Sequence, residues 1–473
     1  SQIAEQIRQL VAKGILSPES RVPSTRALAD QLGVSRNTVA LAYDLLIGEG
    51  LLDVESSAGT RVSPKLPAAF FRAEPSPSGA TDGEARPYTR RPLAFRGRAP
   101  RLDQSDSPAL AYDFRLGQPD PSFFPLSIWR RLIVERVARA SSALVRYGDP
   151  AGYLPLRAAI AEHLRVARGI RCEASHVVIV AGCQEGLNLV ARLLVTSGVD
   201  TVVENPCYEG ASLVLSSYGG NLIAIPVDDE GISVDRLPHA AALAYVTPSH
   251  QFPLGPTLSL TRRFALLDWS RKTGAYLVED DYDSDFRYEG SPLLALSALD
   301  AQGATIYLGT FSKSIGPGLR LGYAVFPQSL IEQAIAAKGL LDNGHPWLEQ
   351  AAAAEFLASG GFERHLQRIR RRYLMRRDCL LHELGRHFGP CRVDGAEGGM
   401  HVAWHLPAGA PSARAMQLRL RTEGVGIYTL PDGPAQVLEP VDGEDRVVLL
   451  GYPCLTEDRI RYAVERMARA AFS

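Results

Sequence analysis

The sequence has few cysteines and no long apolar run. Its 473 residues include six cysteines, and no two of them form a C-x-x-C pair. This pattern argues against a disulfide framework and against a zinc site, so we predict no metal and a reducing, cytoplasmic environment. No run of about 18 or more apolar residues occurs, and the stretch SQIAEQIRQL lacks the apolar core of a signal peptide. We therefore predict no membrane span.

The chain also lacks an excess of charge of either sign. Its formal net charge is −1, so any contact with nucleic acid must come from a local patch and not from the whole surface. The hydrophobic content is 46%, which over this length is enough for a large core and for two or three domains.

Residues 1–62 have the pattern of three helices followed by a hairpin. The stretch VPSTRALADQLGVSRNTVALAYDLLIGEG predicts two helices around a tight turn, with Ser24 and Ser35 as N-caps and Gly33 as the left-handed turn residue. The side chains expected to face inward are Ile3, Ile7, Leu10, Val11, Leu28, Ala29, Leu32, Val39, Ala42, Tyr43 and Leu46. The following LLDVESSAGTRV predicts two short strands. Together these elements form a winged helix-turn-helix.

Such a fold presents the start of its third helix, here Arg36, Asn37 and Thr38, to DNA. Net charge gives no support, because six Lys and Arg face seven Asp and Glu in residues 1–62. The positions of the arginines do support DNA binding, because Arg26 and Arg36 begin consecutive helices and Arg61 lies on the expected wing. An arginine at the start of a recognition helix can pair with guanine. The alternative is a winged helix used for protein contacts.

Residues 63–107 lose apolar periodicity and gain proline and serine, which predicts a flexible linker. Its second half, RPYTRRPLAFRGRAPR, has six arginines and no acidic residue. Two interpretations stay open for this segment: a solvated tether, or an auxiliary contact with the phosphate backbone.

From residue 108 onward, predicted strands alternate with predicted helices. The strands are HVVIVAG, DTVVEN, NLIAIPV, ALAYVTP, AYLVEDD and TIYLGTF. This alternation is typical of a doubly wound, largely parallel sheet. From about residue 330 the pattern is mainly helical, with strands near GGMHVAWHL and RVVLLGY, and predicts a smaller α/β subdomain.

The stretch GTFSKSIGPGLRLGY places Lys313 in a loop after a buried strand, where open α/β sheets bind ligands. A neutral lysine amine in a dry pocket forms a Schiff base with an aldehyde. The aldehyde cofactor pyridoxal 5′-phosphate (PLP) further needs a partner for its ring nitrogen and a donor for its phenolic oxygen. Its phosphate needs a helix N-terminus with a cation.

Residues at other strand ends meet these needs. Asp280 ends the strand AYLVEDD, where a carboxylate can keep a ring nitrogen protonated, and Tyr282 can donate to the phenolic oxygen. Tyr208 can stack on the ring. The predicted phosphate cradle consists of the backbone N–H groups of Gly182, Cys183 and Gln184 with the side chains of Thr310 and Arg320. Taken singly, Asp280 also fits a structural cap and Tyr208 also fits core packing.

Residues 108–473 resemble the fold-type I PLP-dependent aminotransferases. The resemblance lies in YGDPAGYLPLR, AGCQEGLNL, ENPCYEG, TPSHQFPLG, EDDYDSDF and GTFSKSIGPGLRLGY. Residues 1–62 resemble the winged helix of the GntR regulators through VPSTRALADQLGVSRNTVALAY and GTRV. The fusion in this order resembles the MocR/GabR class of bacterial transcription factors.

The resemblance implies a homodimer in which Lys313 holds PLP and Tyr147 reaches the site of the other subunit. The cofactor residues that we predict are Lys313, Asp280, Tyr282, Tyr208, Gly182, Cys183, Gln184, Thr310, Ser312, Arg320, Tyr147 and Gln251. The predicted DNA-binding residues are Ser24, Arg26, Ser35, Arg36, Asn37, Thr38, Gly59, Thr60 and Arg61.

The sequence also departs from the aminotransferase pattern. Leu449 stands where many aminotransferases have an arginine for the substrate carboxylate, and Arg446, three residues earlier, would point to the opposite face. Cys183 replaces a small hydroxyl residue. The asparagine of N-P-T-G loops gives way to HQFPLG, so His250 or Gln251 is a candidate to replace it. His250 and His401 also fit structural, hydrogen-bonded histidines.

We therefore predict a PLP-dependent transcriptional regulator that senses a small amine, an amino compound or PLP itself and binds operator DNA. At most residual transaminase turnover is expected. The alternative is a working aminotransferase with an appended winged helix, in which the cofactor residues would be the same.

Overall fold

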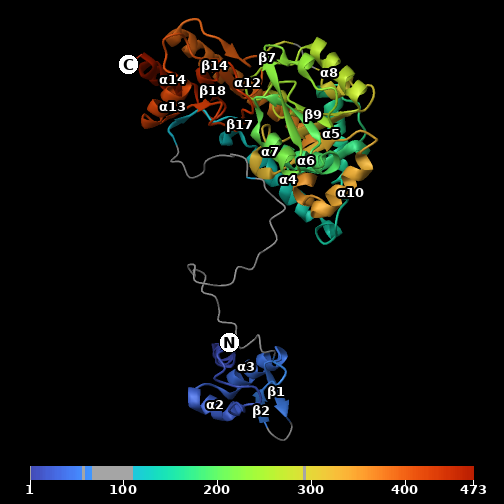
Figure 1. The fold of residues 1–473 in the computed structure, drawn as a ribbon, viewed down its shortest axis with the longest axis vertical. Coiled ribbons are helices and arrows are strands. Elements are labelled where there is room, and N and C mark those ends of the chain that lie inside the picture. The colour runs from blue at the N-terminus through green and yellow to red at the C-terminus, as the bar shows by residue number, and fades with distance from the viewer. Residues whose placement is uncertain (1, 56–58, 67–97, 99–109, 291–293, 473) are drawn as a thin grey trace. The chain divides into compact units, whose positions relative to one another are not determined.

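The computed structural model describes residues 2–55, 59–66, 98, 110–290 and 294–472. Contacts divide the chain into two compact units, Ser1–Pro92 and Leu93–Ser473 (Figure 1). Most of the predicted linker lies outside the described residues. In the part of the chain that is described, no helix has the length and apolar character needed to cross a membrane.

The first unit has the predicted three helices and hairpin. Its elements are α1 (Gln2–Ala12), α2 (Thr25–Leu32), α3 (Arg36–Gly48), β1 (Leu52–Glu55) and β2 (Gly59–Val62). The Ser24 hydroxyl accepts the N–H of Ala27 at 3.2 Å, and the Ser35 hydroxyl accepts that of Thr38 at 3.1 Å. Gly33 ends α2 with φ +66°. The predicted caps and turn residue are therefore confirmed.

The core of this unit corrects two sequence predictions. The inward stripe of α3 is buried as predicted, but Leu10 is 38% exposed and Leu32 is 44% exposed. In α1 the buried residues are Ala4, Ile7 and Val11, and Leu10 lies at the edge of that stripe. Leu32 is the last residue of α2, where the chain turns away at the glycine cap.

The second unit is built on an eight-stranded sheet with the order β4-β12-β11-β10-β9-β5-β7-β8. Its strands are β4 (Val177–Val180), β5 (Asp200–Asn205), β7 (Asn221–Asp228), β8 (Gly231–Ile232), β9 (Leu243–Val246), β10 (Tyr276–Asp281), β11 (Thr305–Thr310) and β12 (Gly322–Val325). The six predicted strands are all present. Strand β12 is antiparallel to both neighbours and β8 to β7, so the largely parallel sheet has two strands that the sequence did not predict.

Helices cover both faces of this sheet (Figure 1). One face packs on α6 (Cys183–Leu194), α7 (Glu209–Ser217) and α10 (Ile331–Asp342), and the other on α5 (Leu154–Ala167), α8 (Leu260–Thr273) and α9 (Leu296–Leu299). Strand side chains alternate between the faces: Val278 packs with α6, whereas Leu277 packs with α8. The same alternation separates Asp280 from Asp281 at the end of β10.

A smaller antiparallel sheet has the order β13-β14-β18-β16. The remaining elements are β3 (Tyr112–Asp113), β6 (Cys207–Tyr208), β13 (Val393–Asp394), β14 (His401–His405), β15 (Val425–Gly426), β16 (Tyr428–Thr429), β17 (Ala435–Gln436), β18 (Val447–Gly451), α4 (Leu126–Ala138), α11 (Trp347–Ala358), α12 (Gly361–Phe388), α13 (Ala413–Thr422) and α14 (Glu457–Phe472). Because α10 packs on α6 and α11 on α5, both belong with the large sheet. The small subdomain therefore begins later than the expected residue 330.

Short strand pairs connect the two parts. Strand β3 pairs with β15, and β17 pairs with β6, which brings the segment before α4 and the loop after β16 to the carboxyl end of the large sheet. The linker residue Arg98 forms an ion pair of 2.6 Å with Glu209, a fully buried carboxylate at the start of α7. For Arg98 this ion pair differs from both sequence interpretations, and the other arginines of the stretch lie outside the described residues.

Candidate functional site

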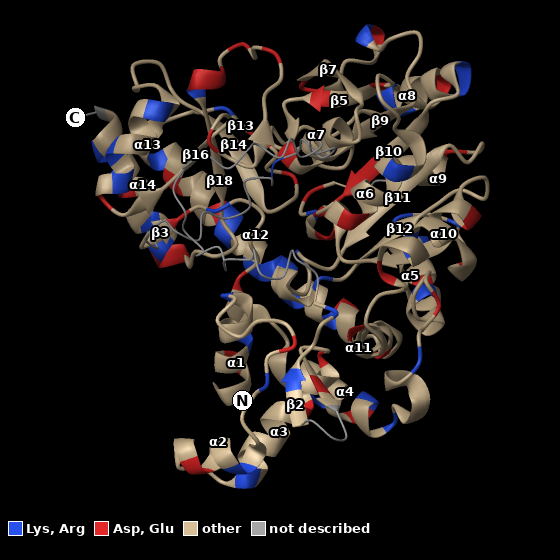
Figure 2. Cartoon of the chain, turned by 60° about the horizontal axis from the view of Figure 1, so that its bottom comes forward, with Lys and Arg blue, Asp and Glu red and all other residues tan. Residues whose placement is uncertain are grey.

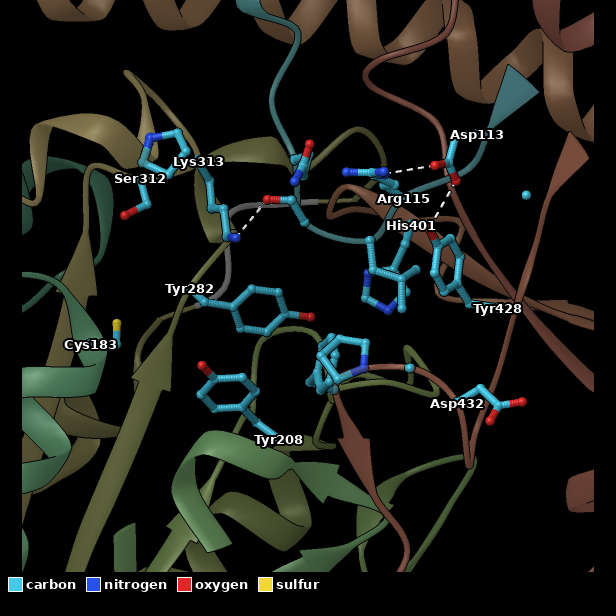
Figure 3. Close-up of a pocket in the computed structure, with 18 of the residues that line it drawn as sticks. Asp113, Arg115, Cys183, Tyr208, Tyr282, Ser312, Lys313, His401, Tyr428 and Asp432 are labelled. Atoms are coloured by element: carbon cyan, nitrogen blue, oxygen red, sulfur yellow. Dashed lines mark hydrogen bonds and ion pairs between the residues drawn. The ribbon is translucent and has the colours of Figure 1, made fainter. Parts of the chain in front are cut away.

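A cavity of about 950 Å³ opens at the carboxyl ends of β4, β9, β10 and β11. Its walls come from the large sheet, the segment around β3, and α13 and β16 of the small subdomain (Figure 3). The predicted cofactor residues that line it are Gly182, Cys183, Gln184, Tyr208, Asp280, Tyr282, Thr310, Ser312, Lys313 and Arg320. Residues from four separate segments of the chain thus meet in one cavity.

Lys313 enters the cavity from the loop after β11. Its Nζ donates to the carbonyl oxygen of Gly117 at 2.6 Å (Figure 3). Desolvation lowers the pKa of this amine, although the nearby Asp283, Cys183 and Asp280 oppose the decrease. A lowered pKa favours the neutral form, which is the form that reacts with an aldehyde.

Asp280 lies at the floor of the cavity and is 4% exposed. Its Oδ2 accepts the hydroxyl of Tyr245 at 2.8 Å, whereas its Oδ1 has no hydrogen-bond partner among the described residues. Burial raises the pKa of this carboxyl to about 6, and the Tyr245 hydroxyl limits the increase. A buried acceptor without a donor fits a protonated ring nitrogen placed against it.

The predicted phosphate cradle is also assembled. Gly182 (φ +97°) caps α6, so the first N–H groups of that helix face the cavity. The positive φ of Gly182 favours glycine there, whereas a Cβ would meet the Arg320 guanidinium at 3.5 Å, an ordinary contact distance. Arg320 has φ +49°, an uncommon conformation that occurs at functional sites. The Thr310 hydroxyl donates to that of Ser312 at 2.9 Å. These residues fit the phosphate and ring of PLP.

Two tyrosines and a phenylalanine form an aromatic wall. The Tyr208 hydroxyl donates to Gln184 Oε1 at 3.2 Å, and the Tyr208 ring meets Phe252 edge-on at 5.9 Å between centroids. The Tyr282 ring meets Phe252 in the same way at 5.8 Å. Figure 3 shows Tyr208 and Tyr282 together beside Lys313. Tyr208 thus lines the cavity while it also packs against a neighbour.

Two predicted cofactor residues lie elsewhere. Tyr147 is 90% exposed and does not line the cavity of its own chain. Gln251 is buried outside it, and its amide donates to Glu204 and to the backbone carbonyls of Pro206 and Phe252. Its neighbour Phe252 lines the cavity instead, so an aromatic ring without a donor stands directly before the proline of HQFPLG.

The two histidines have different positions. His401 lines the cavity, its Nε2 lies 3.0 Å from the carbonyl oxygen of Pro253, and burial lowers its pKa to about 3. His250 lies behind the cavity wall, with its Nδ1 3.0 Å from the hydroxyl of Tyr282. Both histidines are hydrogen-bonded, as one of the two sequence interpretations held.

The structure adds residues that the sequence analysis missed. Tyr245, the penultimate residue of β9, donates to Asp280 of the neighbouring strand β10, and only the strand order reveals that neighbour. Asp113, the last residue of β3, accepts from Arg115 at 2.6 Å and from Tyr428 at 2.9 Å (Figure 3). Cavity residues of α13 are Arg414, Gln417, Leu418 and Arg421. Their helical spacing was a usable signal, but nothing in it showed which cavity they would face.

The expected loss of a carboxylate-binding arginine is explained by packing. Leu449 is fully buried in an apolar cluster with Ala403, Leu430 and Val447. The guanidinium of Arg446 donates to backbone carbonyls of Leu406, Pro407, Ala410 and Pro411. Neither position supplies a cation to the cavity.

In the first unit, the start of α3 is available for contact. Arg26, Arg36, Asn37 and Thr38 are exposed, and the Thr38 hydroxyl lies 2.8 Å from that of Ser35. Gly59, Thr60 and Arg61 lie in β2, the second strand of the hairpin. Figure 2 shows acidic as well as basic residues on this unit, in agreement with its balanced charge.

Comparisons with known proteins identify both units. The family model for bacterial regulatory proteins of the gntR family matches residues 1–62, and that for aminotransferase class I and II matches residues 113–467. The probable rhizopine catabolism regulatory protein MocR of Rhizobium meliloti is 37% identical over 407 residues, which cover 85% of this chain and 80% of the relative. This chain belongs to the MocR/GabR class of transcriptional regulators.

The MocR-class regulator has further relatives over its length. The pyridoxine biosynthesis regulator PdxR of Corynebacterium glutamicum is 33% identical, over 99% of this chain and 95% of the relative. The kynurenine aminotransferase of Pyrococcus horikoshii, solved in complex with PMP, superposes with a TM-score of 0.69 at 30% identity. That superposition covers 77% of the regulator and 91% of the enzyme. The large unit of this MocR-class regulator therefore has the fold of PLP-dependent aminotransferases.

Proposed function

We propose that this regulator binds PLP at Lys313 and that occupancy of the cavity controls how its winged helices bind operator DNA. One observation carries the cofactor assignment: the buried Oδ1 of Asp280 lacks a donor, in the same cavity that Lys313 enters. A ring nitrogen that carries a proton supplies this donor and its positive charge.

The residues divide the work of holding the cofactor. When bound, PLP supplies an aldehyde that joins a primary amine and a ring that withdraws electrons. Lys313 anchors the aldehyde carbon, Asp280 keeps the ring nitrogen protonated, and Tyr282 donates to the phenolic oxygen. The start of α6, with Thr310 and Arg320, holds the phosphate.

The effector is a small amine, an amino compound or PLP itself. Leu449 lacks the cation that aminotransferases use at this position, but Arg115, Arg414 and Arg421 line the cavity, so a carboxylate on the effector would pair with one of these arginines and not in the aminotransferase manner. An effector controls DNA binding only if it binds two conformations of the protein with different affinity.

The proposed assembly is a homodimer. Exposed apolar side chains lie on α4, on the segment that follows it, and on α10: Leu126, Val134, Val137, Leu144, Val145, Tyr147 and Leu340. Exposure of this extent supports an interface between two chains. In such a dimer Tyr147 is free to reach the partner's cavity, and two winged helices read two DNA half-sites.

The alternative is a working aminotransferase, whose cofactor contacts would be the same. The visible spectrum of purified, PLP-loaded protein separates the two when amines and amino acids are added with and without a keto acid. A spectrum that shifts once and then stays constant supports a sensor and identifies the effector class. Repeated turnover to amino product supports the enzyme, and the absence of any PLP band contradicts the cofactor assignment.

A further inference from the structure

Behind the cavity wall, one nitrogen atom faces two oxygen atoms. His250 Nδ1 lies 3.0 Å from the carboxylate Oδ2 of Asp283 and 3.0 Å from the phenolic oxygen of Tyr282. His250 and Asp283 are both buried, and neither lines the cofactor cavity, whereas Tyr282 does. The three side chains therefore connect the cavity to the interior of the protein.

The surroundings decide where the imidazole proton lies. Asp283 Oδ2 already accepts the N–H of Met400 at 3.2 Å, so it acts as an acceptor toward His250 as well. His250 Nε2 is buried without a hydrogen-bond partner among the described residues, and a buried N–H without an acceptor is rare. The proton therefore lies on Nδ1, which donates to Asp283.

This assignment fixes the direction of the Tyr282 hydroxyl. An Nδ1 that carries hydrogen has no lone pair with which to accept from a phenol. The Tyr282 oxygen consequently faces an N–H group, and its own O–H must point elsewhere. Two acceptors remain for that O–H: the Asp283 carboxylate, which already accepts from His250 and Met400, and, because the tyrosine lines the cavity, the phenolic oxygen of the cofactor.

The imidazole is held in place from several sides. A Cβ on Gly395 would come within 2.7 Å of His250 Nε2, and one on Gly399 would overlap the ring. The His401 ring lies 4.8 Å away between centroids. Both glycines and His401 belong to the small subdomain, so His250 is clamped between the two parts of the unit.

The same groups raise the question of a metal ion, since His250, Asp283 and His401 offer ligand atoms within 4.8 Å of one another. A small adjoining cavity of about 20 Å³ is lined by both Arg168 and Arg287. Two guanidinium groups oppose the binding of a cation there. The charges favour a hydrogen-bonded relay over a metal centre.

We propose that His250 is a positioning residue, which through Asp283 holds the Tyr282 hydroxyl in its donating direction toward the cofactor's phenolic oxygen. This assignment rests on the proposed function. Because the clamp on His250 comes from the small subdomain, movement of that subdomain would change the donor to the cofactor. His250 thus links the hydrogen bond to the cofactor's phenolic oxygen to the position of the small subdomain against the large sheet.

The test is the pH dependence of the visible band of the full-length, PLP-loaded protein. A donor at the phenolic oxygen stabilises its negative charge, so loss of the donor raises the midpoint of the titration. Tyr282→Phe is expected to raise it by about one pH unit, the equivalent of one hydrogen bond. His250→Phe is expected to produce most of that rise, and to add nothing in a protein that already carries Tyr282→Phe.

Two conservative variants provide the matched comparison. An amide at position 250 places its N–H near the Nδ1 position in His250→Asn and near the Nε2 position in His250→Gln. We expect wild-type behaviour for Asn and the raised midpoint for Gln, and this pair decides the matter if His250→Phe does not fold. Equal midpoints for the wild type, His250→Asn and His250→Gln would overturn the positioning role of His250 and leave the proposed function unaffected. A wild-type protein without a PLP band would overturn the proposed function as well.

Discussion

The uncompensated carboxylate of Asp280 predicts how strongly the cofactor is held. Burial raises the pKa of this group from its ordinary 3.8 to about 6. That difference corresponds to about 3 kcal/mol for ionising Asp280 in the cofactor-free cavity above pH 6. A protonated ring nitrogen must offset at least this cost when it pairs with the carboxylate. We therefore expect Asp280→Asn to weaken PLP binding at pH 8 by about 3 kcal/mol, on the order of 100-fold.

The assay is equilibrium titration of cofactor-free protein with PLP, followed by the visible band. Glu289→Gln is the matched control, because Glu289 is an exposed carboxylate paired with Arg377 outside the cavity. This control should bind PLP like the wild type. An Asp280→Asn protein that folds and binds PLP within about threefold of the wild type would refute the reasoning, since about threefold is less than 1 kcal/mol.

The same group predicts a pH dependence of stability. An acid whose pKa is raised in the folded state holds a proton that the unfolded chain releases, so the stability of the cofactor-free protein falls as pH rises from about 4 to about 6. The contribution of Asp280 is about 3 kcal/mol, is constant above pH 6, and should be missing in Asp280→Asn. Urea unfolding of the two cofactor-free proteins at both ends of this range measures it.

Three further variants test other parts of the account. Lys313→Ala should abolish the PLP visible band with an unchanged circular dichroism spectrum, and an unaltered band would contradict the role of Lys313. Arg36→Ala should weaken binding to specific DNA by about 1–3 kcal/mol if the arginine reads a base, whereas an equal loss on random DNA would identify a phosphate contact. Glu204 has a pKa raised to about 7 by burial, so stability should fall between about pH 4.5 and pH 7; Glu204→Gln should remove about 3 kcal/mol of that fall, as urea unfolding can show.

Local chemistry made much of this structure predictable from sequence. Ser24, Ser35 and Gly33 each act within a few residues of their own position, so capping rules were enough to place the ends of α2 and α3. The loop with Lys313 and the strand end with Asp280 were placed because strands of a parallel sheet end at one edge. Such inferences need only the order of elements along the chain.

Other features depend on contacts between distant segments. That Tyr245 donates to Asp280 follows from the adjacency of β9 and β10, and that Arg446 is occupied follows from four carbonyl groups of the chain around Leu406. Gln251 was predicted at the cofactor and lies outside the cavity, because its amide satisfies three groups of the neighbouring loops. Sequence spacing does not reveal which polar partner a side chain will find.

The central claim is that the cofactor cavity controls DNA binding. The most direct measurement is the affinity of the full-length protein for a DNA fragment enriched from a random pool, with and without PLP and with each amine that shifts the visible band. The account predicts a change in wild-type affinity of about fivefold or more on ligand binding, and no change in Lys313→Ala. A wild-type affinity that is the same with and without every ligand would contradict the claim.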